Sequence, residues 1–458
     1  MASVLAAPNW PAFHGPNSSG VGLDDKPPVT VGPTNSVLWK TKVPWAPSSP
    51  CVWDDQIYVT TFDAGELDTQ AYRRADGTLA WSHGVRADKL QLYHGTESSP
   101  AASSPVVDGS RVVSYFGSFG LVCYDHAGRE LWRHPMPVAT SLGGYGTATS
   151  PVIASGLVVV MHDRDEHSTL LAADLATGKT VWETARPNAF GSFGTPVVWQ
   201  NAGSLEIVVP GSIRLKGYDL KTGKEDWVVD GLCPFPYATP IVTDDFLLYG
   251  AWTDGKADSP WPSWEQFLEK YDKNKNGTVE LTEFDDASRD YFRGFDTDQN
   301  GRIDQSDLER MRAALVKGEN LMVAVKPGGH GDITRSHVAW QTGRGVPYIA
   351  SPVVWEGRIY TVRSGGMMSC FDAKTGKTVY LQERLGVEGN YYASLIAADG
   401  RVYAASQSGK LLVVKAGGDH PEILHQADFG EPIYATPALA GGQLYLRTHD
   451  HLYAFGNR

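Results

Sequence analysis

The sequence predicts an all-β fold, an eight-bladed β-propeller that is closed by its own N-terminal strand and carries a small α-helical EF-hand insertion. Three observations predict it: a short signal that recurs eight times before an apolar strand, a turn-and-tryptophan motif late in most repeats, and two chain ends that complement each other. The 458 residues include 49 Gly and 28 Pro, which is typical of a globular chain with many turns.

The first repeat signal is a Ser or Thr that is followed by Pro, or once by Leu, directly before an apolar strand. Its Ser or Thr members are Ser49, Ser104, Ser150, Thr195, Thr239, Ser351, Ser394 and Thr436. Neighbouring members lie 42 to 55 residues apart, except for one interval of 112 residues. Because one blade takes roughly 40 to 50 residues, the long interval holds a blade and about 65 inserted residues.

The second signal is a turn with a tryptophan a few residues later. Residues 172–182 and 217–227 share the order small residue, Asp, Thr-Gly and Trp. Asp and Thr-Gly supply a tight turn with a positive-φ glycine, so the motif predicts a hairpin of two strands. We expect the aromatic rings to wedge between neighbouring blades. Looser copies end in Trp81, Trp132, Trp340 and Tyr380, and the copy near Leu424 has lost the aromatic residue.

The two ends of the chain each lack what the other has. Residues 36–40 carry a matching Trp39 with no repeat before it, and residues 452–455 form a last strand with no tryptophan strand after it. We therefore expect residues 35–42 to complete the last blade and leave no free sheet edge. The predicted division is a leader packing on the propeller at 1–34, blades one to five (first part) at 35–252, the insertion at 253–319, and the remaining blades at 320–458.

The insertion contains two loops with the spacing of EF-hands. Each loop has oxygen-bearing residues at positions 1, 3, 5, 9 and 12, glycine at position 6, and a backbone carbonyl available at position 7. The second loop ends in Asp, which reaches a cation less easily than Glu, so we expect one strong and one weaker calcium site. The alternative is a pair of Asn/Asp-rich surface turns without metal. The expected ligands are Asp272, Asn274, Asn276, Thr278, Glu280 and Glu283 in the first loop, and Asp296, Asp298, Asn300, Arg302, Asp304 and Asp307 in the second.

Apolar residues on both sides of the loops predict flanking helices, with one middle helix shared by both loops. Val279 and Ile303 hold position 8 of their loops and are expected to pair as a short strand. Calcium is expected to stiffen the insertion, with a regulatory sensor as the alternative. Its removal is then expected to unfold residues 262–316 and to leave the propeller folded.

The charge of the chain excludes some partners as defaults. With 52 acidic and 40 basic residues the formal net charge is −12, which repels nucleic acid and anionic membrane surfaces. No apolar run is long enough to span a bilayer. Residues 2–7 look like the tail of a trimmed export signal, so a periplasmic or secreted location is expected. Cys51, Cys123, Cys233 and Cys370 stand singly and are expected to be buried.

The loops that lead into the innermost strands are the candidate ligand site, because they meet at the mouth of the central channel. Phe193, Tyr237, Tyr392 and Tyr434 each lie three residues before the last residue of the repeat signal, and Tyr348 lies four before it. They predict an aromatic collar able to stack on a sugar ring or a flat cofactor. The alternative is that the rings pack blade against blade. Polar candidates at similar loops include Arg447.

No catalytic residue can be assigned from spacing. His330 and Asp332 lie in a Gly-rich segment, where a hydrogen-bonded turn is favoured over acid/base catalysis.

The Thr-Gly-Lys-x-x-Trp hairpins resemble the tryptophan-docking repeats of pyrroloquinoline-quinone-type eight-bladed propellers, a group that includes quinoprotein alcohol dehydrogenases and the outer-membrane assembly propeller. Residues 10–17, 328–334 and 447–453 look like an exported bacterial subfamily of PQQ-binding-like β-propellers. The dehydrogenases carry two adjacent, disulfide-bonded cysteines beneath the quinone. Because this chain has no Cys-Cys pair, the resemblance does not extend to the cofactor, and pyrroloquinoline quinone is not expected.

Together these observations predict a monomeric, calcium-binding extracytoplasmic propeller that acts as a ligand-binding or scaffold module. Its ligand is expected to be a glycan, a peptide or a protein at the channel mouth. Two alternatives stay open. One is an enzyme using the same funnel, either a divergent quinone-dependent dehydrogenase or a carbohydrate-active propeller, and the other is a strand-edge assembly partner.

Overall fold

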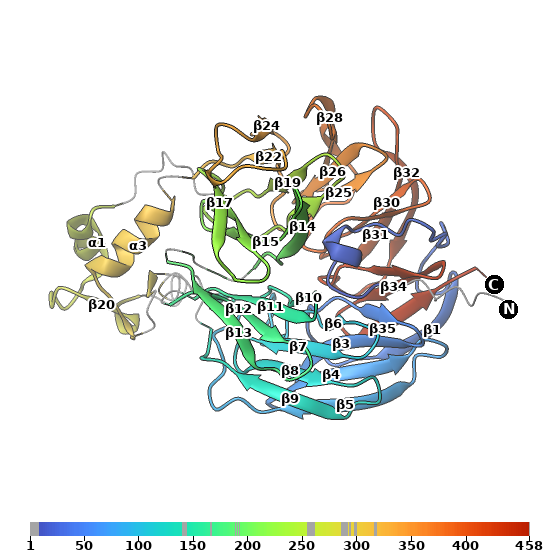
Figure 1. The fold of residues 1–458 in the computed structure, drawn as a ribbon, viewed down its shortest axis with the longest axis horizontal. Helices are drawn as coiled ribbons and strands as arrows, with labels where there is room; N and C mark the ends of the chain where they lie inside the picture. Colours follow the sequence, from blue (N-terminus) through green and yellow to red (C-terminus); the bar gives the residue numbers. More distant parts are fainter. Residues whose placement is uncertain are drawn as a thin grey trace.

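The computed structural model shows eight four-stranded blades arranged in a ring, with a small helical insertion at one side (Figure 1). The all-β eight-bladed architecture is therefore confirmed. The structure describes residues 9–139, 144–164, 167–187, 189, 191, 193–253, 262–284, 292, 295–296, 300–315 and 318–457.

Each blade begins with its innermost strand and runs outward along the chain. The first four blades consist of β2 (Cys51–Trp53), β3 (Gln56–Asp63), β4 (Glu66–Arg73) and β5 (Leu79–Val85); β6 (Val106–Val107), β7 (Val112–Phe116), β8 (Gly120–Tyr124) and β9 (Glu130–Pro135); β10 (Val152–Ala154), β11 (Leu157–His162), β12 (Thr169–Asp174) and β13 (Thr180–Ala185); and β14 (Val197–Asn201), β15 (Ser204–Gly211), β16 (Arg214–Asp219) and β17 (Glu225–Asp230).

The fifth blade contains the insertion between its second and third strands, and a two-residue strand, β23 (Gly331–Asp332), adds to the outer edge of the fourth blade. The last four blades consist of β18 (Ile241–Val242), β19 (Leu247–Gly250), β22 (Met322–Val325) and β24 (Val338–Thr342); β25 (Val353–Trp355), β26 (Arg358–Arg363), β27 (Met367–Asp372) and β28 (Thr378–Arg384); β29 (Ile396–Ala398), β30 (Arg401–Ala405), β31 (Lys410–Lys415) and β32 (Glu422–Asp428); and β33 (Ala438–Ala440), β34 (Gln443–Arg447), β35 (His451–Phe455) and β1 (Val37–Lys42).

The N-terminal strand closes the ring, as the chain ends predict. Strand β1 pairs antiparallel with β35, so that Lys40 lies opposite Tyr453. The eighth blade thus takes its outermost strand from the start of the chain, so the two ends of the chain lie in one sheet and close the ring.

The indoles dock between blades, and the docking explains the Thr-Gly turn. Trp132 of the second blade donates its Nε1–H to the carbonyl of Leu175 in the third blade, at 3.0 Å. Its ring lies on Gly178, where a Cβ would come within 2.6 Å of the indole and where φ is +71°. Glycine fits this position because it has no Cβ to collide with the indole and adopts a positive φ without strain. The same arrangement recurs for Trp39, Trp81, Trp182 and Trp340, which lie against Gly77, Gly128, Gly223 and Gly376 of the next blade.

Two aromatic positions depart from this pattern. Trp227 donates instead to the buried carboxyl group of Glu206 in its own blade, at 2.6 Å. Tyr380 is buried, and its hydroxyl has no hydrogen-bond partner among the described residues. Among the described residues, neither side chain donates a hydrogen bond to a backbone carbonyl of the following blade.

The repeated Ser and Thr residues form a closed ring of eight hydrogen bonds around the channel. In each blade the backbone N–H of this residue donates to the hydroxyl oxygen of the equivalent residue in the next blade, and Thr436 returns to Ser49, at distances of 2.8 to 3.1 Å. Because one blade supplies the donor and the next the acceptor, the ring links all eight innermost strands.

The N-terminal leader crosses the channel at the end away from the repeat signal. Trp10 bridges to Val52 in the first blade, the Asn17 side chain exchanges two hydrogen bonds with the backbone of Val198 in the fourth, and Val21 bridges to Ala397 in the seventh. A 3-10 helix, η1 (Pro16–Ser18), lies on this path. The leader therefore covers one end of the channel and leaves the other as the mouth.

The insertion has a separate apolar cluster of its own. Its described elements are α1 (Trp264–Tyr271), β20 (Val279–Glu280), η3 (Leu281–Glu283), β21 (Arg302–Ile303) and α3 (Gln305–Leu315). Ser263 caps α1 through a capping box with Gln266. Phe267, Val279, Phe284, Phe292, Ile303 and Leu308 form the buried cluster. Most of the predicted middle helix lies outside the described residues.

Reciprocal hydrogen bonds between the backbone of Thr253 and the side chain of Asn320 hold the two ends of the insertion together. Because strand direction alternates along each blade, the hairpin that contains the insertion opens on the same side as the channel mouth. No helix among the described residues has the length and apolar composition needed to cross a bilayer. The four cysteines are free and buried, as predicted.

Two buried histidines are expected to make stability fall at acid pH. Burial lowers the pKa of His14 to about 4 and that of His162 to about 3. Between these values and the ordinary 6.5 the unfolded chain binds more protons than the folded chain, so acid favours unfolding. Each histidine is expected to cost about 2 kcal/mol at pH 5 relative to pH 7. Burial raises the pKa of Glu206 to about 6, and that shift acts in the opposite direction as the pH falls.

Urea unfolding of the wild type and of His162→Gln at pH 7 and pH 5 measures this effect. The variant is expected to lose about 2 kcal/mol less on acidification than the wild type. His420→Gln, at a side chain that is 70% exposed, serves as the control and is expected to behave like the wild type. Equal losses in wild type and His162→Gln would contradict the assignment of a buried neutral imidazole.

Candidate ligand-binding funnel

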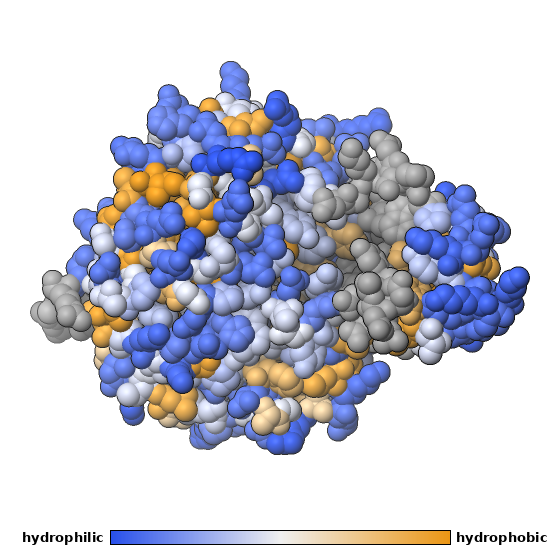
Figure 2. Space-filling view, turned by 180° about the vertical axis from the view of Figure 1, so that it is seen from behind, coloured by the Kyte–Doolittle hydropathy of each residue, from blue (hydrophilic) through white to orange (hydrophobic). Residues whose placement is uncertain are grey.

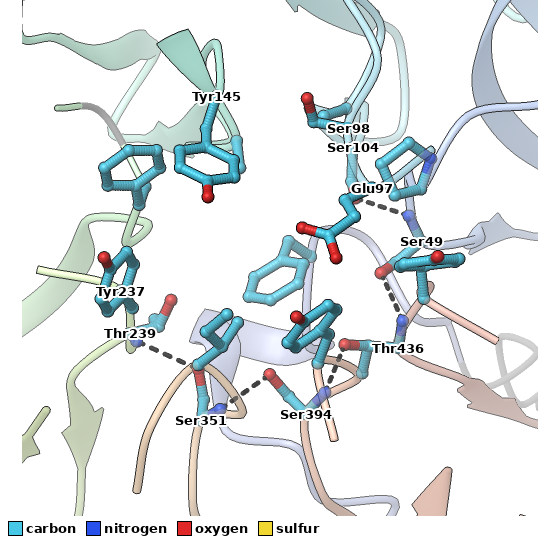
Figure 3. A pocket seen from close by; sticks show the side chains of 18 of the residues that line it. Ser49, Glu97, Ser98, Ser104, Tyr145, Tyr237, Thr239, Ser351, Ser394 and Thr436 are labelled. Carbon is cyan, nitrogen blue, oxygen red and sulfur yellow. Dashed lines mark hydrogen bonds between the residues drawn. The ribbon is translucent and has the colours of Figure 1, made fainter. Parts of the chain in front are cut away.

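A cavity of about 250 Å³ lies at the mouth end of the channel, inside the ring of hydroxyls (Figure 3). Phe13 of the leader lies at its base, and loops from the blades form its wall. The lining is mainly aromatic and hydroxylic: Phe13, Tyr145, Phe193, Tyr237, Tyr348, Tyr392 and Tyr434 are the rings, and Ser49, Ser98, Ser104, Thr239, Ser351, Ser394 and Thr436 are the hydroxyls. Pro47, Glu97, Ala102, Ala148 and Ile349 complete the lining.

The rings of the collar contact one another in two arcs. Phe193, Tyr237 and Tyr348 form the first, with centroids 5.3 Å and 5.5 Å apart. Tyr392 and Tyr434 form the second, at 6.0 Å. The rings therefore pack against neighbours across blades, and they also line the cavity.

Tyr145 is a sixth ring of the wall, and it is 48% exposed. It packs against His94 at a centroid distance of 4.3 Å. Sequence spacing missed it because it lies six residues before Pro151, outside the interval of the other collar residues.

Glu97 supplies the one carboxylate among the lining residues, and Figure 3 shows it turned toward the centre of the funnel. Its loop is held by a hydrogen bond from the Tyr434 hydroxyl to the carbonyl of Thr96, at 2.8 Å, and by the amide of Ser98 donating to His94. In the described part of the chain no hydrogen bond or ion pair engages the Glu97 side chain. No repeat signal marks this residue, which lies in the long loop between β5 and β6, and sequence reasoning missed it.

The phenols of Tyr237 and Tyr392 stay neutral at physiological pH. Burial raises the pKa of Tyr237 well above its ordinary value, and burial raises the pKa of Tyr392, with the Glu97 charge adding to the effect. No lysine or arginine is among the lining residues that the structure describes. The charge in the funnel is therefore that of Glu97.

The structure brings five of the six predicted ligand-binding residues together, namely Phe193, Tyr237, Tyr348, Tyr392 and Tyr434. Arg447 does not join them. Its guanidinium is fully buried and donates to the carbonyls of Pro44, Ser48 and Thr60 and to the Ser48 hydroxyl, which ties the last blade to the first. Burial lowers the pKa of Arg447 to about 10.

The two Asn/Asp-rich loops of the insertion turn their side chains back onto their own backbone. In the first loop Asp272 accepts from the amide of Gly277 at 3.0 Å, and Asn276 accepts from the amide of Thr278 at 2.9 Å. Asn274 accepts from the amide of Asn276, Glu280 accepts from the side chains of both asparagines, and Glu283 accepts from the amide of Glu280.

The second loop repeats this arrangement where it is described. Asp296 accepts from the amides of Asn300 and Gly301, Asn300 accepts from the amide of Arg302, and Asp307 accepts from the amide of Asp304. Asp298 lies outside the described residues. Val279 pairs with Ile303, as predicted for position 8 of the two loops. Among the described residues no three His, Cys, Asp or Glu side chains converge closely enough to hold a metal ion by themselves.

His330 and Asp332 lie in a hydrogen-bonded turn, as predicted. Asp332 accepts from the amide of Thr334, and the exposed ring of His330 contacts the carboxylate of Asp226 at 2.6 Å. Neither residue lines the funnel.

The sequence pattern of the family described as "Outer membrane protein assembly factor BamB" matches residues 70–230 and 305–420, which together are more than half of the chain. The chain belongs to this family. A relative in Moranella endobia, the outer membrane protein assembly factor BamB, is 24% identical over 222 residues, which are 47% of this chain and 52% of that protein. The chain thus spans about half the length of the relative it matches.

Solved structures share the fold at low sequence identity. BamB from Moraxella catarrhalis superposes with a TM-score of 0.58 at 12% identity, over 91% of this chain and 98% of that one. A europium-containing methanol dehydrogenase gives 0.60 at 11% identity over 98% of both chains. Quinohemoprotein alcohol dehydrogenase from Comamonas testosteroni gives 0.58 at 12% identity, over 100% of this chain and 82% of that one. At such identities the likeness concerns the fold.

Proposed function

We propose that this family member is an extracytoplasmic binding module that captures part of a protein or peptide partner in its funnel. The observation that carries the proposal is a cavity covered at one end by the leader and walled by six aromatic rings at the other. Aromatic side chains dominate the energetic centres of protein interfaces. The family's name, outer membrane protein assembly factor, supports a protein partner and a location outside the cytoplasm.

A large apolar docking face is not needed for this role. Outside the grey residues, the face seen in Figure 2 is mainly hydrophilic, with apolar residues in separate groups. A concave site that buries a small part of the partner is the arrangement that such a surface favours.

A quinone-dependent reaction in the funnel is disfavoured by the chemistry of its lining. Pyrroloquinoline quinone carries three carboxyl groups, whereas the lining offers one carboxylate and, among its described residues, no cationic side chain. The four cysteines are separate and buried. The residues present therefore do not fit the quinone, and we derive no catalytic step through it.

Peptide and glycan arrays, probed with labelled wild type and with Tyr145→Ala and Tyr392→Ala, test the proposal. Wild type is expected to bind a subset of peptides, and both variants are expected to lose that binding by tenfold or more. Val181→Ala on the outermost strand of the third blade, at a side chain that is 50% exposed, is the control and is expected to bind normally. Peptide binding that survives both collar variants, or binding confined to glycans, would refute a peptide-capturing funnel.

We further propose that the insertion is an EF-hand pair that binds calcium and stiffens the mouth side of the propeller. Asp272, Asn274, Asn276, Glu280 and Glu283 supply the hard oxygens that calcium prefers, and the backbone carbonyl of Thr278 is available as a further ligand. The hydrogen bonds from backbone amides to Asp272 and Glu283 within the first loop and the Val279–Ile303 pairing between the loops support this assignment. Asp296, Asn300, Arg302 (through its carbonyl), Asp304 and Asp307 of the second loop would form the weaker site, with Asp298.

Calcium is expected to stabilise residues 262–316 alone. At a free concentration a hundredfold above the dissociation constant, it is expected to add about 2.7 kcal/mol to the local free energy of unfolding. Hydrogen exchange with and without a chelator measures this by segment. Glu283→Gln is expected to abolish the stabilisation by calcium. Glu269→Gln, at an exposed position of α1, is the control and is expected to retain it. A single cooperative melt of the whole chain that the chelator shifts as one unit would contradict the proposal.

A further inference from the structure

We propose that the group captured in the funnel is a compact organic ammonium, with Glu97 as its counter-charge and the aromatic collar as its cage. This inference rests on the proposed function and specifies the chemistry of the ligand at the same site. It joins three properties of the funnel: the sign of its charge, the kind of surface that lines it, and its size.

The negative charge of Glu97 favours a cationic ligand in the funnel. The Glu97 carboxylate is half-buried and points inward, and in the described part of the chain no side chain or amide pairs with it. A carboxylate that is partly withdrawn from water is costly unless a charge or a donor compensates it. The guanidinium of Arg363 lies over the ring of Trp252, at 4.0 Å from its centroid, and is outside the lining. A bound ammonium would supply the missing charge.

The wall of the funnel suits a soft organic cation better than a metal ion. The faces of aromatic rings attract cations that come within about 6 Å of the centroid, and cages of such rings are a recurrent way to hold quaternary ammonium groups. Tyr145, Tyr237, Tyr348, Tyr392 and Tyr434 line the cavity from different sides, and burial raises the pKa of the Tyr237 and Tyr392 phenols. A divalent metal needs several hard oxygen ligands, and the lining offers a single carboxylate.

The size of the cavity sets the scale of the ligand. About 250 Å³ is less than the roughly 300 to 1,000 Å³ of sites that hold drug-sized molecules. A trimethylammonium or alkylammonium head group matches this volume, while a folded domain or an oligosaccharide does not enter it. The net charge of −12 also favours the approach of cations to the mouth.

Isothermal titration calorimetry tests the inference with charged probes and their neutral isosteres. Choline is compared with 3,3-dimethylbutan-1-ol, and N-acetyl-trimethyllysine methylamide with its analogue in which a tert-butyl group replaces the trimethylammonium group. We expect at least one ammonium probe to bind ten or more times tighter than its isostere, and its affinity to fall as salt is raised. Binding of choline alone identifies a small free ammonium compound as the source of the group, and binding of the lysine derivative identifies a peptide side chain.

Glu97→Gln keeps the shape of the side chain and removes its charge. It is expected to reduce ammonium binding tenfold or more, whereas Glu183→Gln on the outer strand β13 removes the same charge from an exposed site and is expected to leave binding unchanged. Equal affinity for charged and neutral probes, undiminished binding by Glu97→Gln, or no binding of either ammonium probe would overturn the inference. If neutral peptides still bind and collar variants abolish that binding, the proposed function stands without it.

Discussion

Replacing Trp132 with alanine is expected to lower the free energy of unfolding by about 3 to 5 kcal/mol, because a buried indole is lost and a cavity remains between two blades. The side chain is 8% exposed, packs on Gly178 and donates to Leu175 in the next blade. Urea denaturation followed by far-UV circular dichroism measures the loss. Gly178→Ala is expected to destabilise as well, because its Cβ would overlap the indole from the opposite side at a strained φ.

Two phenylalanine variants test the hydrogen bonds of the aromatic residues between blades. Trp132→Phe removes the donor to the Leu175 carbonyl together with part of the buried ring, and is expected to cost about 1 to 3 kcal/mol. Tyr380→Phe removes a buried hydroxyl that has no partner among the described residues, so it is expected to be neutral or slightly stabilising. If Trp132→Ala cost less than 1 kcal/mol, the wedge between blades would not stabilise the ring.

Replacing Asp163 with alanine is expected to destabilise the protein by about 3 to 5 kcal/mol, because it leaves the buried guanidinium of Arg186 without a counter-charge. The two groups form a bidentate ion pair at 2.8 Å and 2.9 Å, with exposures of 2% for Arg186 and 0% for Asp163. Burial raises the pKa of Asp163, and the attraction of Arg186 opposes that shift. Arg186 also donates to Tyr218 in the neighbouring blade.

An exposed ion pair provides the matched comparison. Glu66→Gln breaks the contact with Arg86, whose side chain is 70% exposed, and is expected to cost under about 1 kcal/mol. Replacing Asp163 and Arg186 together by Leu and Met is expected to recover most of the loss, because no charge is then left buried. A double variant as unstable as Asp163→Ala would show that the cost is not electrostatic.

The fold could be predicted because the signals that mark each repeat lie within a few residues of one another in the sequence. The Thr-Gly turn and Trp182 mark the last hairpin of a blade, and Trp39 at one end matches the missing strand at the other. The partners of the repeated Ser and Thr residues could not be predicted, because the hydrogen bond joins residues of adjacent blades, about one repeat apart. The acceptor of Trp227 could not be predicted for a different reason, because Glu206 lies on another strand of the same blade, 21 residues earlier.

The candidate site could be predicted in part, and the misses have a common physical reason. Four of the collar residues lie three positions before the last residue of the repeat signal, so Tyr237 and Tyr392 were within reach of sequence analysis. Glu97 and Phe13 enter the funnel from an irregular loop and from the leader, where no periodic signal exists. Arg447 was wrongly predicted to line the funnel, because its position in the repeat does not indicate the direction of its side chain. In the structure the side chain turns toward the carbonyls of the first blade.

Blocking the funnel with a covalent adduct tests most directly whether the ligand occupies it. Ala148→Cys places a thiol at an exposed residue of the lining, and Ala176→Cys places one at an exposed turn on the opposite face. The four native cysteines are buried, and burial raises the pKa of the Cys233 thiol to about 12, so a bulky neutral maleimide is expected to label the new thiol selectively. Labelled Ala148→Cys is predicted to lose binding of the peptides that wild type selects, while labelled Ala176→Cys keeps it; equal binding by both adducts would contradict the account.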